Sequence, residues 1–207
     1  MVDKTPNLAA MWDERFSRTE PVYGDAPNAY LREQAQKRLK AGAKVLVPGD
    51  GYGRNGLWLA KQGCELTTID VSPVGVERAR NDAKKAGLAL QILLGDVNTW
   101  DWPKNEFDAI VSIYLHLPPE QRSVVHAQMF EALRPGGIVI LEAFTRAQLQ
   151  FSSGGPKQVE LLYSAEILRQ DFAAAEILEL AELEIDLHEG KMHLGEGAVV
   201  RAVLRKK

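Results

Sequence analysis

The chain has 207 residues, of which 45% are hydrophobic and 26% are charged, and its formal net charge is −3. We expect one domain spanning residues 1–207, because this length and composition suffice for a full core. The negative charge argues against a nucleic-acid or membrane-surface binder, since both need concentrated positive charge. The single cysteine, Cys64, excludes an internal disulfide and a thiolate metal cluster. With no signal peptide and no long apolar run, a cytoplasmic protein is expected.

The N-terminal segment is rich in aromatic residues. Trp12 and Phe16 lie one helical turn apart, and residues 25–27 read as the start of a helix that runs to about Leu39. We expect residues 1–40 to form a lid and a helix. Trp12 and Tyr23 are candidates for contact with a substrate, with ordinary helix packing as the alternative.

Strand and helix signals alternate between residues 44 and 144. Predicted strands cover 44–47, 65–70, 90–94, 107–113 and 138–144, and predicted helices cover 54–62, 73–85 and 118–133. The central strands are apolar throughout, as parallel strands covered on both faces should be. The pattern predicts a doubly wound, Rossmann-like α/β sheet with helices on both faces.

The C-terminal part follows a different pattern. Residues 183–187 alternate between apolar and polar side chains, and residues 198–204 are a second apolar run after a glycine-rich turn. These runs predict an antiparallel hairpin that completes a seven-stranded sheet. Before them, residues 145–163 contain Gly154 and Gly155 and form a candidate substrate loop, with Phe151 as a candidate contact.

A glycine-rich turn follows the first predicted strand of the sheet. Gly49, Gly51 and Gly53 leave bare backbone, and the next helix begins near Arg54. A strand, a glycine turn and a helix N-terminus together form a cradle for a cofactor. Residues 51–56 also satisfy the dinucleotide pattern G-x-G-x-x-G, but its register places the glycines later than a nicotinamide fingerprint requires.

Two carboxylates indicate which cofactor the cradle holds. Asp70 ends the second predicted strand, where a carboxylate can accept the hydroxyls of a ribose. Asp96 ends the third, where it can accept an adenine amino group while the Val97 N–H meets a ring nitrogen. The alternative is that Asp96 only caps a turn. Together with the glycine cradle, the two positions favour S-adenosyl-L-methionine (SAM) over a nicotinamide.

Several segments between Val45 and Phe144 resemble the class I SAM-dependent methyltransferases. They comprise the glycine loop, Thr68-Ile69-Asp70-Val71-Ser72-Pro73, Gly95-Asp96-Val97, Phe107-Asp108-Ala109-Ile110-Val111-Ser112 and Leu133-Arg134-Pro135-Gly136-Gly137. Trp12-Asp13-Glu14-Arg15-Phe16, Tyr23-Gly24, Pro27-Asn28 and Gly53-Arg54-Asn55 are similar to the tellurite-resistance and thiopurine methyltransferase-like branch. Residues 45–49 are also similar to thiol and halide methyltransferases.

The resemblance implies methyl transfer from SAM, with S-adenosyl-L-homocysteine as product, to a small-molecule acceptor such as a thiol or chalcogen compound. We also expect a monomer or homodimer with no nucleic-acid, membrane or metal partner. The chain departs from the family at Val47, where an acidic residue is usual, and Asp50 could replace it. The cofactor residues implied are Gly49, Asp50, Gly51, Gly53, Arg54, Asn55, Asp70, Val71, Asp96, Val97, Ser112 and Ile113.

Candidates for chemistry follow the fourth predicted strand. Tyr114 and His116 could face the acceptor, with a backbone-bonded turn as the alternative for His116. His193 is a candidate substrate contact, because a parallel sixth strand would bring the hairpin turn to the cofactor edge; a solvated turn is the alternative. His126 reads as a surface helix residue. Two other functions stay open: a nicotinamide-dependent oxidoreductase and a SAM-binding protein without catalysis.

Overall fold

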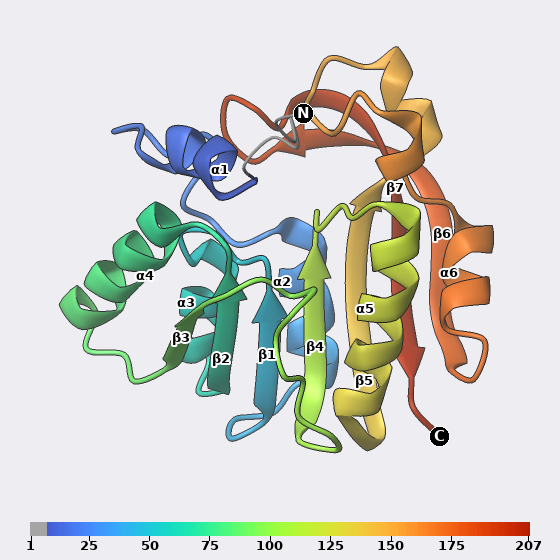
Figure 1. The fold of residues 1–207 in the computed structure, drawn as a ribbon, viewed down its shortest axis with the longest axis horizontal. Helices are drawn as coiled ribbons and strands as arrows, with labels where there is room; N and C mark the ends of the chain where they lie inside the picture. The colour runs from blue at the N-terminus through green and yellow to red at the C-terminus, as the bar shows by residue number, and fades with distance from the viewer. Residues whose placement is uncertain (1–7) are drawn as a thin grey trace, which may run out of the picture.

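The computed structural model describes residues 8–207, so residues 1–7 of the predicted N-terminal lid lie outside the described residues (Figure 1). In chain order, the helices are α1 (Leu8–Phe16), α2 (Ala29–Arg38), α3 (Arg54–Lys61), α4 (Pro73–Lys85), α5 (Pro119–Ala132) and α6 (Ala165–Asp171), with short 3-10 turns at Arg146–Gln150 and Val159–Leu161. The strands are β1 (Lys44–Pro48), β2 (Glu65–Asp70), β3 (Gln91–Leu94), β4 (Phe107–Ile113), β5 (Leu133–Phe144), β6 (Glu176–His188) and β7 (Leu194–Arg205).

Within the described residues the strands form one seven-stranded sheet in the order β3-β2-β1-β4-β5-β7-β6. The pairs among β1 to β5 are parallel, and β7 is antiparallel to both β5 and β6. The doubly wound sheet with a C-terminal hairpin is thereby confirmed. Because β6 runs in the same direction as β5, the β6–β7 turn lies at the edge where the parallel strands end.

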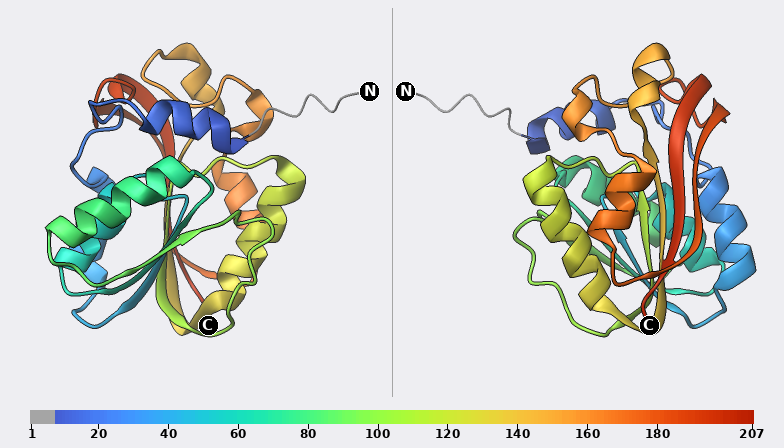
Figure 2. Two further views of the ribbon diagram at one scale, coloured as in Figure 1. Left: turned by 60° about the vertical axis from the view of Figure 1, so that its left-hand side comes forward. Right: turned by 90° about the vertical axis from the view of Figure 1, so that its right-hand side faces the viewer.

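Alternate residues of the central strands pack into opposite faces of the sheet. Leu46 and Ile110 join the core beneath α5 and α6, whereas Val45 and Val47 join the core beneath α2 and α3. The two views of Figure 2 show helices on both sides of the sheet. The apolar strand pattern predicted this arrangement, because a strand buried on both faces has no position for a solvated side chain.

Three segments that are distant in the sequence meet above the carboxyl ends of the strands: α1, the β6–β7 turn and the region of the 3-10 turns (Figures 1 and 2). The chain before α2 touches the hairpin turn very closely. A Cβ on Gly190, whose φ is +92°, would lie 2.4 Å from the Gly24 nitrogen. Only glycine permits this approach, so the N-terminal segment and the hairpin form one surface over the strand ends.

Several elements differ from the sequence-based expectation. The hairpin strands are longer than predicted, and β5 begins at Leu133 rather than at residue 138. Helix α6 was not predicted, and its packing makes the surface interpretation of His126 wrong. The Nδ1 atom of His126 lies 2.8 Å from Asp171 Oδ2 at the end of α6, and the residue is 1% exposed.

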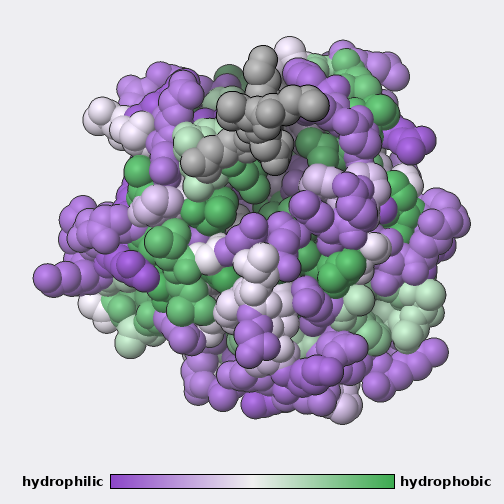
Figure 3. Space-filling view, viewed as in Figure 1, coloured by the Kyte–Doolittle hydropathy of each residue, from purple (hydrophilic) through white to green (hydrophobic). Residues whose placement is uncertain are grey.

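No helix in the described part of the chain is long and apolar enough to cross a membrane. In the space-filling view, hydrophobic residues are distributed in patches among polar ones (Figure 3). Leu94 and Val124 are examples of large apolar residues that remain about half exposed.

Candidate functional site

The glycine loop after β1 is held in place by the end of β2. Gly49, Gly51 and Gly53 have φ angles of +69°, +59° and +87°, a region that side-chain-bearing residues rarely adopt. The Gly49 N–H donates to the Ile69 carbonyl and the Gly51 N–H to Asp70 Oδ2, both at 2.7 Å. The shape of the loop therefore depends on the carboxylate that ends β2.

The two predicted carboxylates lie at the ends of neighbouring strands, Asp70 as the last residue of β2 and Asp96 just after β3. Asp70 is nearly buried, and its Oδ1 accepts the Ser72 N–H at 2.9 Å, which orients the carboxylate at the strand end. Burial raises the pKa of Asp70 against the effect of these hydrogen bonds. Asp96 Oδ1 accepts from the Asn98 backbone N–H and side-chain amide at 2.9 and 2.7 Å, so this carboxylate closes a turn.

The remaining predicted cofactor residues lie around these strand ends. Val71 follows β2 and is partly exposed, while Val97 is buried and its carbonyl accepts the Trp102 indole N–H at 2.8 Å. Ser112 and Ile113 are buried at the end of β4. The fold therefore brings residues from three strand ends to one edge of the sheet.

Asp50 is turned away from the surface of the loop. Its Oδ2 accepts the Gly56 N–H at 3.0 Å in the first turn of α3, and its Oδ1 is buried without a hydrogen-bond partner. Burial raises the pKa of Asp50 to about 8. A Cβ on Gly56 would lie 2.5 Å from Asp50 Oδ2, so the helix start is shaped around this carboxyl group. Val47 is buried in the sheet core.

Side chains from two other segments cover the glycine loop. A Cβ on Gly51 would lie 2.7 Å from Phe16 Cζ of α1, and a Cβ on Gly49 would lie 3.0 Å from Leu115 Cδ1. Phe16 stacks on Trp12 with ring centroids 5.4 Å apart, and Trp12 lies 6.4 Å from Tyr23. The predicted aromatic residues of the N-terminal segment thus form one cluster directly over the loop.

A buried polar network links the start of α3 to the hairpin turn. Arg54 Nη2 contacts Glu189 Oε2 at 2.7 Å, with the two side chains only 8% and 10% exposed. Asn28, just before α2, donates through Nδ2 to Glu189 Oε1 at 2.8 Å and to Glu142 Oε1 at 2.6 Å, and its backbone N–H donates to Asn55 Oδ1 at 3.0 Å.

Sequence reasoning missed three members of this network as site residues: Asn28, Glu142 and Glu189. A signal existed for Glu142, because it is a charged residue within an otherwise apolar predicted strand, where an ionised group needs partners. Asn28 stands before a helix and could have been identified as its N-cap, a role confirmed by its bond from the Leu31 N–H. Only the tertiary fold brings Glu189 to them.

The two predicted catalytic residues have different surroundings. Tyr114 has a φ of +54°, which is unusual for a bulky residue, and its hydroxyl donates to Glu142 Oε1 at 2.7 Å. Burial and the Glu142 carboxylate raise its pKa well above the usual range. His116 is bonded at both ring nitrogens: Nδ1 lies 2.8 Å from the Leu161 carbonyl, and the Phe144 N–H donates to Nε2 at 3.3 Å.

His116 is therefore bonded to the backbone, the alternative weighed from the sequence. Burial, followed by the effect of His193, lowers its pKa to about 4 although the Leu161 bond opposes this, so the ring is neutral at physiological pH. Through these two bonds, His116 connects the segment after β4 to the end of β5 at Phe144 and to the 3-10 turn at Leu161. In this structure neither nitrogen is free for an acceptor.

The candidate substrate contacts lie at the same edge. Phe151 is partly buried at the start of the loop that contains Gly154. His193 is only 5% exposed, and its ring centroid lies 4.6 Å from that of Tyr114 and 4.7 Å from that of Tyr23. The solvated alternative holds for His188, whose side chain is 73% exposed, but not for His193.

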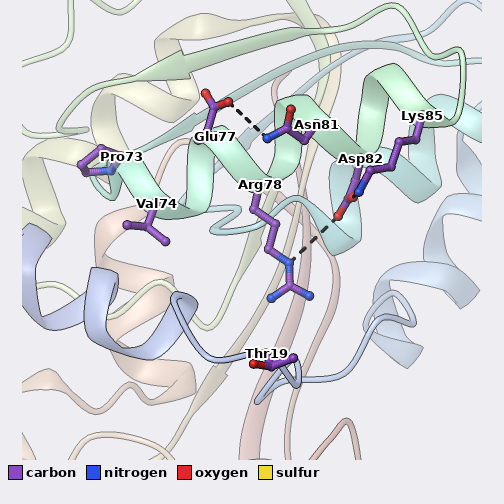
Figure 4. Close-up of a pocket in the computed structure, with 8 residues that line it drawn as sticks. All are labelled: Thr19, Pro73, Val74, Glu77, Arg78, Asn81, Asp82 and Lys85. Atoms are coloured by element: carbon purple, nitrogen blue, oxygen red, sulfur yellow. Dashed lines mark hydrogen bonds and ion pairs between the residues drawn. The ribbon is translucent and has the colours of Figure 1, made fainter.

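A groove of about 690 Å³ lies along the outer side of α4, away from this network. Figure 4 shows its lining, in which Arg78 extends from α4 toward Thr19 and pairs with Asp82. Apart from Pro73 and Val74 at the helix start, its α4 lining is polar, with charges of both signs. No predicted site residue lines this groove, so it lies outside the candidate functional site.

Comparisons with known proteins relate part of the chain to a known family. Residues 45–137 match the family described as Methyltransferase domain. The carboxy-S-adenosyl-L-methionine synthase of Enterobacter sp. (strain 638) is 27% identical over 185 residues, which are 86% of this chain and 70% of that protein. Matches to other curated relatives span 44–63% of those proteins.

Solved structures share the fold at low identity. One is the structure described as "Conversion of a Disulfide Bond into a Thioacetal Group during Echinomycin Biosynthesis". It superimposes with a TM-score of 0.75 at 20% identity, and the match covers 96% of this chain and 92% of the other. The N-methyltransferase NodS from Bradyrhizobium japonicum WM9, in complex with S-adenosyl-L-homocysteine, has a TM-score of 0.71 at 18% identity, covering 96% and 97%.

The glycine loop, the strand-end carboxylates, the sheet order and the family match lead to one conclusion. Residues 45–137 match a methyltransferase domain, and these findings together support a SAM-dependent methyltransferase whose cofactor is S-adenosyl-L-methionine.

Proposed function

We propose that the protein transfers a methyl group from SAM to a small-molecule acceptor, specifically a thiol or a related chalcogen compound. The observation that carries the proposal is the joint position of two features at one sheet edge. One is the glycine loop tied to Asp70, and the other is the aromatic cluster around Tyr114 and His193. An apolar, aromatic surface beside a methyl donor suits a soft, weakly hydrated nucleophile.

The residues at this edge fit SAM. Gly51 presents bare backbone beneath Phe16, which a Cβ would meet at 2.7 Å, so glycine lets the aromatic ring of α1 lie directly on the loop. We assign the glycine loop to the methionine portion together with Ser112 and Ile113, Asp70 to the ribose hydroxyls, and Asp96 with the Val97 N–H to the adenine. When bound, SAM supplies a methyl group activated by a sulfonium.

The protein's own contribution is positioning and exclusion of water. We propose that residues 8–40 act as the lid, because Phe16 and Trp12 lie over the glycine loop. We propose residues 145–163 as the substrate loop, with Phe151 and His193 as contacts. Tyr114, held by Glu142 and already a hydrogen-bond donor, would position the acceptor rather than accept its proton.

Calorimetric titration with S-adenosyl-L-homocysteine, with NADH in parallel, tests the cofactor part. We expect micromolar binding of the former alone. A panel of thiols, selenite and tellurite, with phenols and amines added as oxygen and nitrogen acceptors, is assayed with radiolabelled SAM and tests the acceptor part. Methylation confined to oxygen or nitrogen acceptors would overturn the chalcogen proposal but leave the methyltransferase proposal intact.

Two observations favour a second function, in which SAM is bound but is not used as a methyl donor. The Enterobacter relative is named as a synthase of carboxy-S-adenosyl-L-methionine and not as a methyltransferase. Val47 also stands where the family usually has an acidic residue. Tight S-adenosyl-L-homocysteine binding without methyl transfer to any acceptor in the panel would support this second function.

A further inference from the structure

The β6–β7 turn holds a histidine inside the aromatic cluster at the carboxyl edge. The His193 ring is surrounded by Tyr23, Tyr114 and Phe144, with centroid distances of 4.7, 4.6 and 5.3 Å. Its backbone N–H donates to the Gly190 carbonyl at 3.0 Å, which closes the turn. A buried imidazole held rigidly in a turn needs an explanation, because a solvated turn would accommodate it at no cost.

The two ring nitrogens of His193 have different environments. Nδ1 is buried without a hydrogen-bond partner and lies 3.8 Å from Glu189 Oε2. Burial would raise the pKa of Glu189, but the neighbouring His193 and Arg54 outweigh that effect and lower it to about 2. The carboxylate is therefore ionised, and it favours the tautomer that carries its proton on Nδ1. The lone pair is then on Nε2.

The Nε2 side of the ring borders the candidate substrate loop. A Cβ on Gly154, whose φ is +113°, would lie 3.3 Å from His193 Nε2 and 2.3 Å from the Met192 carbonyl oxygen. A side chain is excluded at this position by both the backbone angle and the contact. Gly154 therefore leaves the basic nitrogen of His193 next to bare backbone in the loop.

The same turn is joined to the cofactor cradle and to the end of β4. Arg54 directly follows Gly53 of the glycine loop and forms the 2.7 Å ion pair with Glu189. Tyr114, which contacts the His193 ring, directly follows the last residue of β4. One buried ion pair and one ring contact thus connect His193 to both segments that we assign to the cofactor.

We propose that His193 is the base that removes the proton from a thiol acceptor and that Glu189 is the positioning residue that fixes its tautomer. In this step the S–H bond breaks, the proton moves to Nε2, and the electron pair stays on sulfur as the nucleophile. The inference rests on the proposed methyltransferase function. It narrows the acceptor to one that carries a proton on its nucleophilic atom, in contrast to tellurite, whose tellurium atom carries none.

Burial is the main reason that this base is neutral before the acceptor binds. Burial lowers the pKa of His193, and Arg54 of α3 acts in the same direction, while Glu189 of the turn and Glu142 of β5 oppose them. The phenol rings of Tyr23 and Tyr114 contact the His193 ring from the other elements, and the nearby His116 ring is neutral. A neutral imidazole is the form that can accept a proton.

The first test needs no variant and no turnover. Nitrogen NMR of protein labelled with ¹⁵N-histidine reports which nitrogen of His193 carries the proton. We expect protonated Nδ1 and bare Nε2 at neutral pH, and a shift of the Nε2 signal when benzylthiol is added with S-adenosyl-L-homocysteine. A proton on Nε2, or an Nε2 signal that does not shift when benzylthiol is added, would overturn the assignment of His193 as the base.

The second test compares His193→Gln with the matched control His188→Gln, which changes an exposed histidine of the same hairpin. With benzylthiol, we expect His193→Gln to lower kcat by about 100-fold or more with a smaller change in KM, as for loss of a general base. With 4-nitrothiophenol, which is already ionised at neutral pH, the loss should be small. Equal rates for the wild type and His193→Gln on benzylthiol would refute the base.

The outcomes separate the two proposals. If the wild type methylates none of the thiols, the thiol proposal fails and the base role fails with it. If the wild type is active and His193→Gln matches it, only the base role fails. Equal melting temperatures for the two variants control for folding, and if His193→Gln does not fold, the NMR result on the wild type decides.

Discussion

Replacing Asp50 by Asn should remove a pH dependence of stability that the fold imposes on the glycine loop. Asp50 is buried at the start of α3, with one carboxyl oxygen bonded to the Gly56 N–H and the other unpaired. Burial raises its pKa from 3.8 to about 8. Asn keeps the acceptor for the Gly56 N–H but cannot ionise.

The sign and size of the change in stability with pH follow from proton linkage. Between the two pKa values the folded protein holds a proton on Asp50 that the unfolded chain has released, so stability falls as the pH rises. The slope is about 1.4 kcal/mol per pH unit, which gives about 3 kcal/mol between about pH 5 and about pH 7. The loss should level off above the folded-state pKa, which is about 8.

Urea unfolding followed by circular dichroism measures the free energy of unfolding at about pH 5, 6 and 7. The free energy of unfolding of Asp50→Asn minus that of the wild type should rise by about 3 kcal/mol over the interval, because all other groups titrate alike in both proteins. Asp101→Asn is the control, since Asp101 is exposed. Parallel curves for the wild type and Asp50→Asn would show that the buried carboxyl does not hold its proton.

Three further substitutions test the site and its supports. Asp70→Ala should weaken S-adenosyl-L-homocysteine binding by more than about tenfold, measured by calorimetry, because the carboxylate both braces the loop and is assigned to the ribose; unchanged affinity would refute that assignment. Asp171→Asn should lower the free energy of unfolding by about 3 kcal/mol, since His126 and Arg122 lose a buried ionised partner; a loss below about 1 kcal/mol would contradict this. Gly154→Ala should lower stability by about 2 kcal/mol or more, since its Cβ would meet the Met192 carbonyl; an unchanged melting temperature would mean that the loop simply moves away.

The sequence predicted the elements whose signals are local. The bounds of β2 and α4 agree with those predicted, because Ser72 caps α4 through its bond from the Gly75 N–H and Pro73 starts the helix. Helix α6 was missed because it is short and its apolar face is defined by what it packs against. The early part of β6 was missed because its glutamates obscure the alternation.

The residues of the candidate site also fall into two groups, those that local sequence signals predict and those that only the fold brings together. The glycine loop and Asp70 could be identified from the sequence, because a turn and the last residue of a strand are properties of a few consecutive residues. The contacts of Glu189 with Arg54 and Asn28 join residues that are 135 and 161 positions apart. No local pattern encodes such a pairing, so His193 could be proposed from topology but its buried surroundings could not.

The sequence by itself therefore determined the parallel sheet, the glycine turn after β1 and the class of cofactor, since apolar runs, glycines and strand-end carboxylates act over short distances along the chain. The tertiary structure alone decided that Asp50 faces inward, that both His116 nitrogens are bonded to the backbone, and that His193 lies beside Glu189. These features depend on which segments meet at the carboxyl edge, and only the packing of the complete fold brings those segments together.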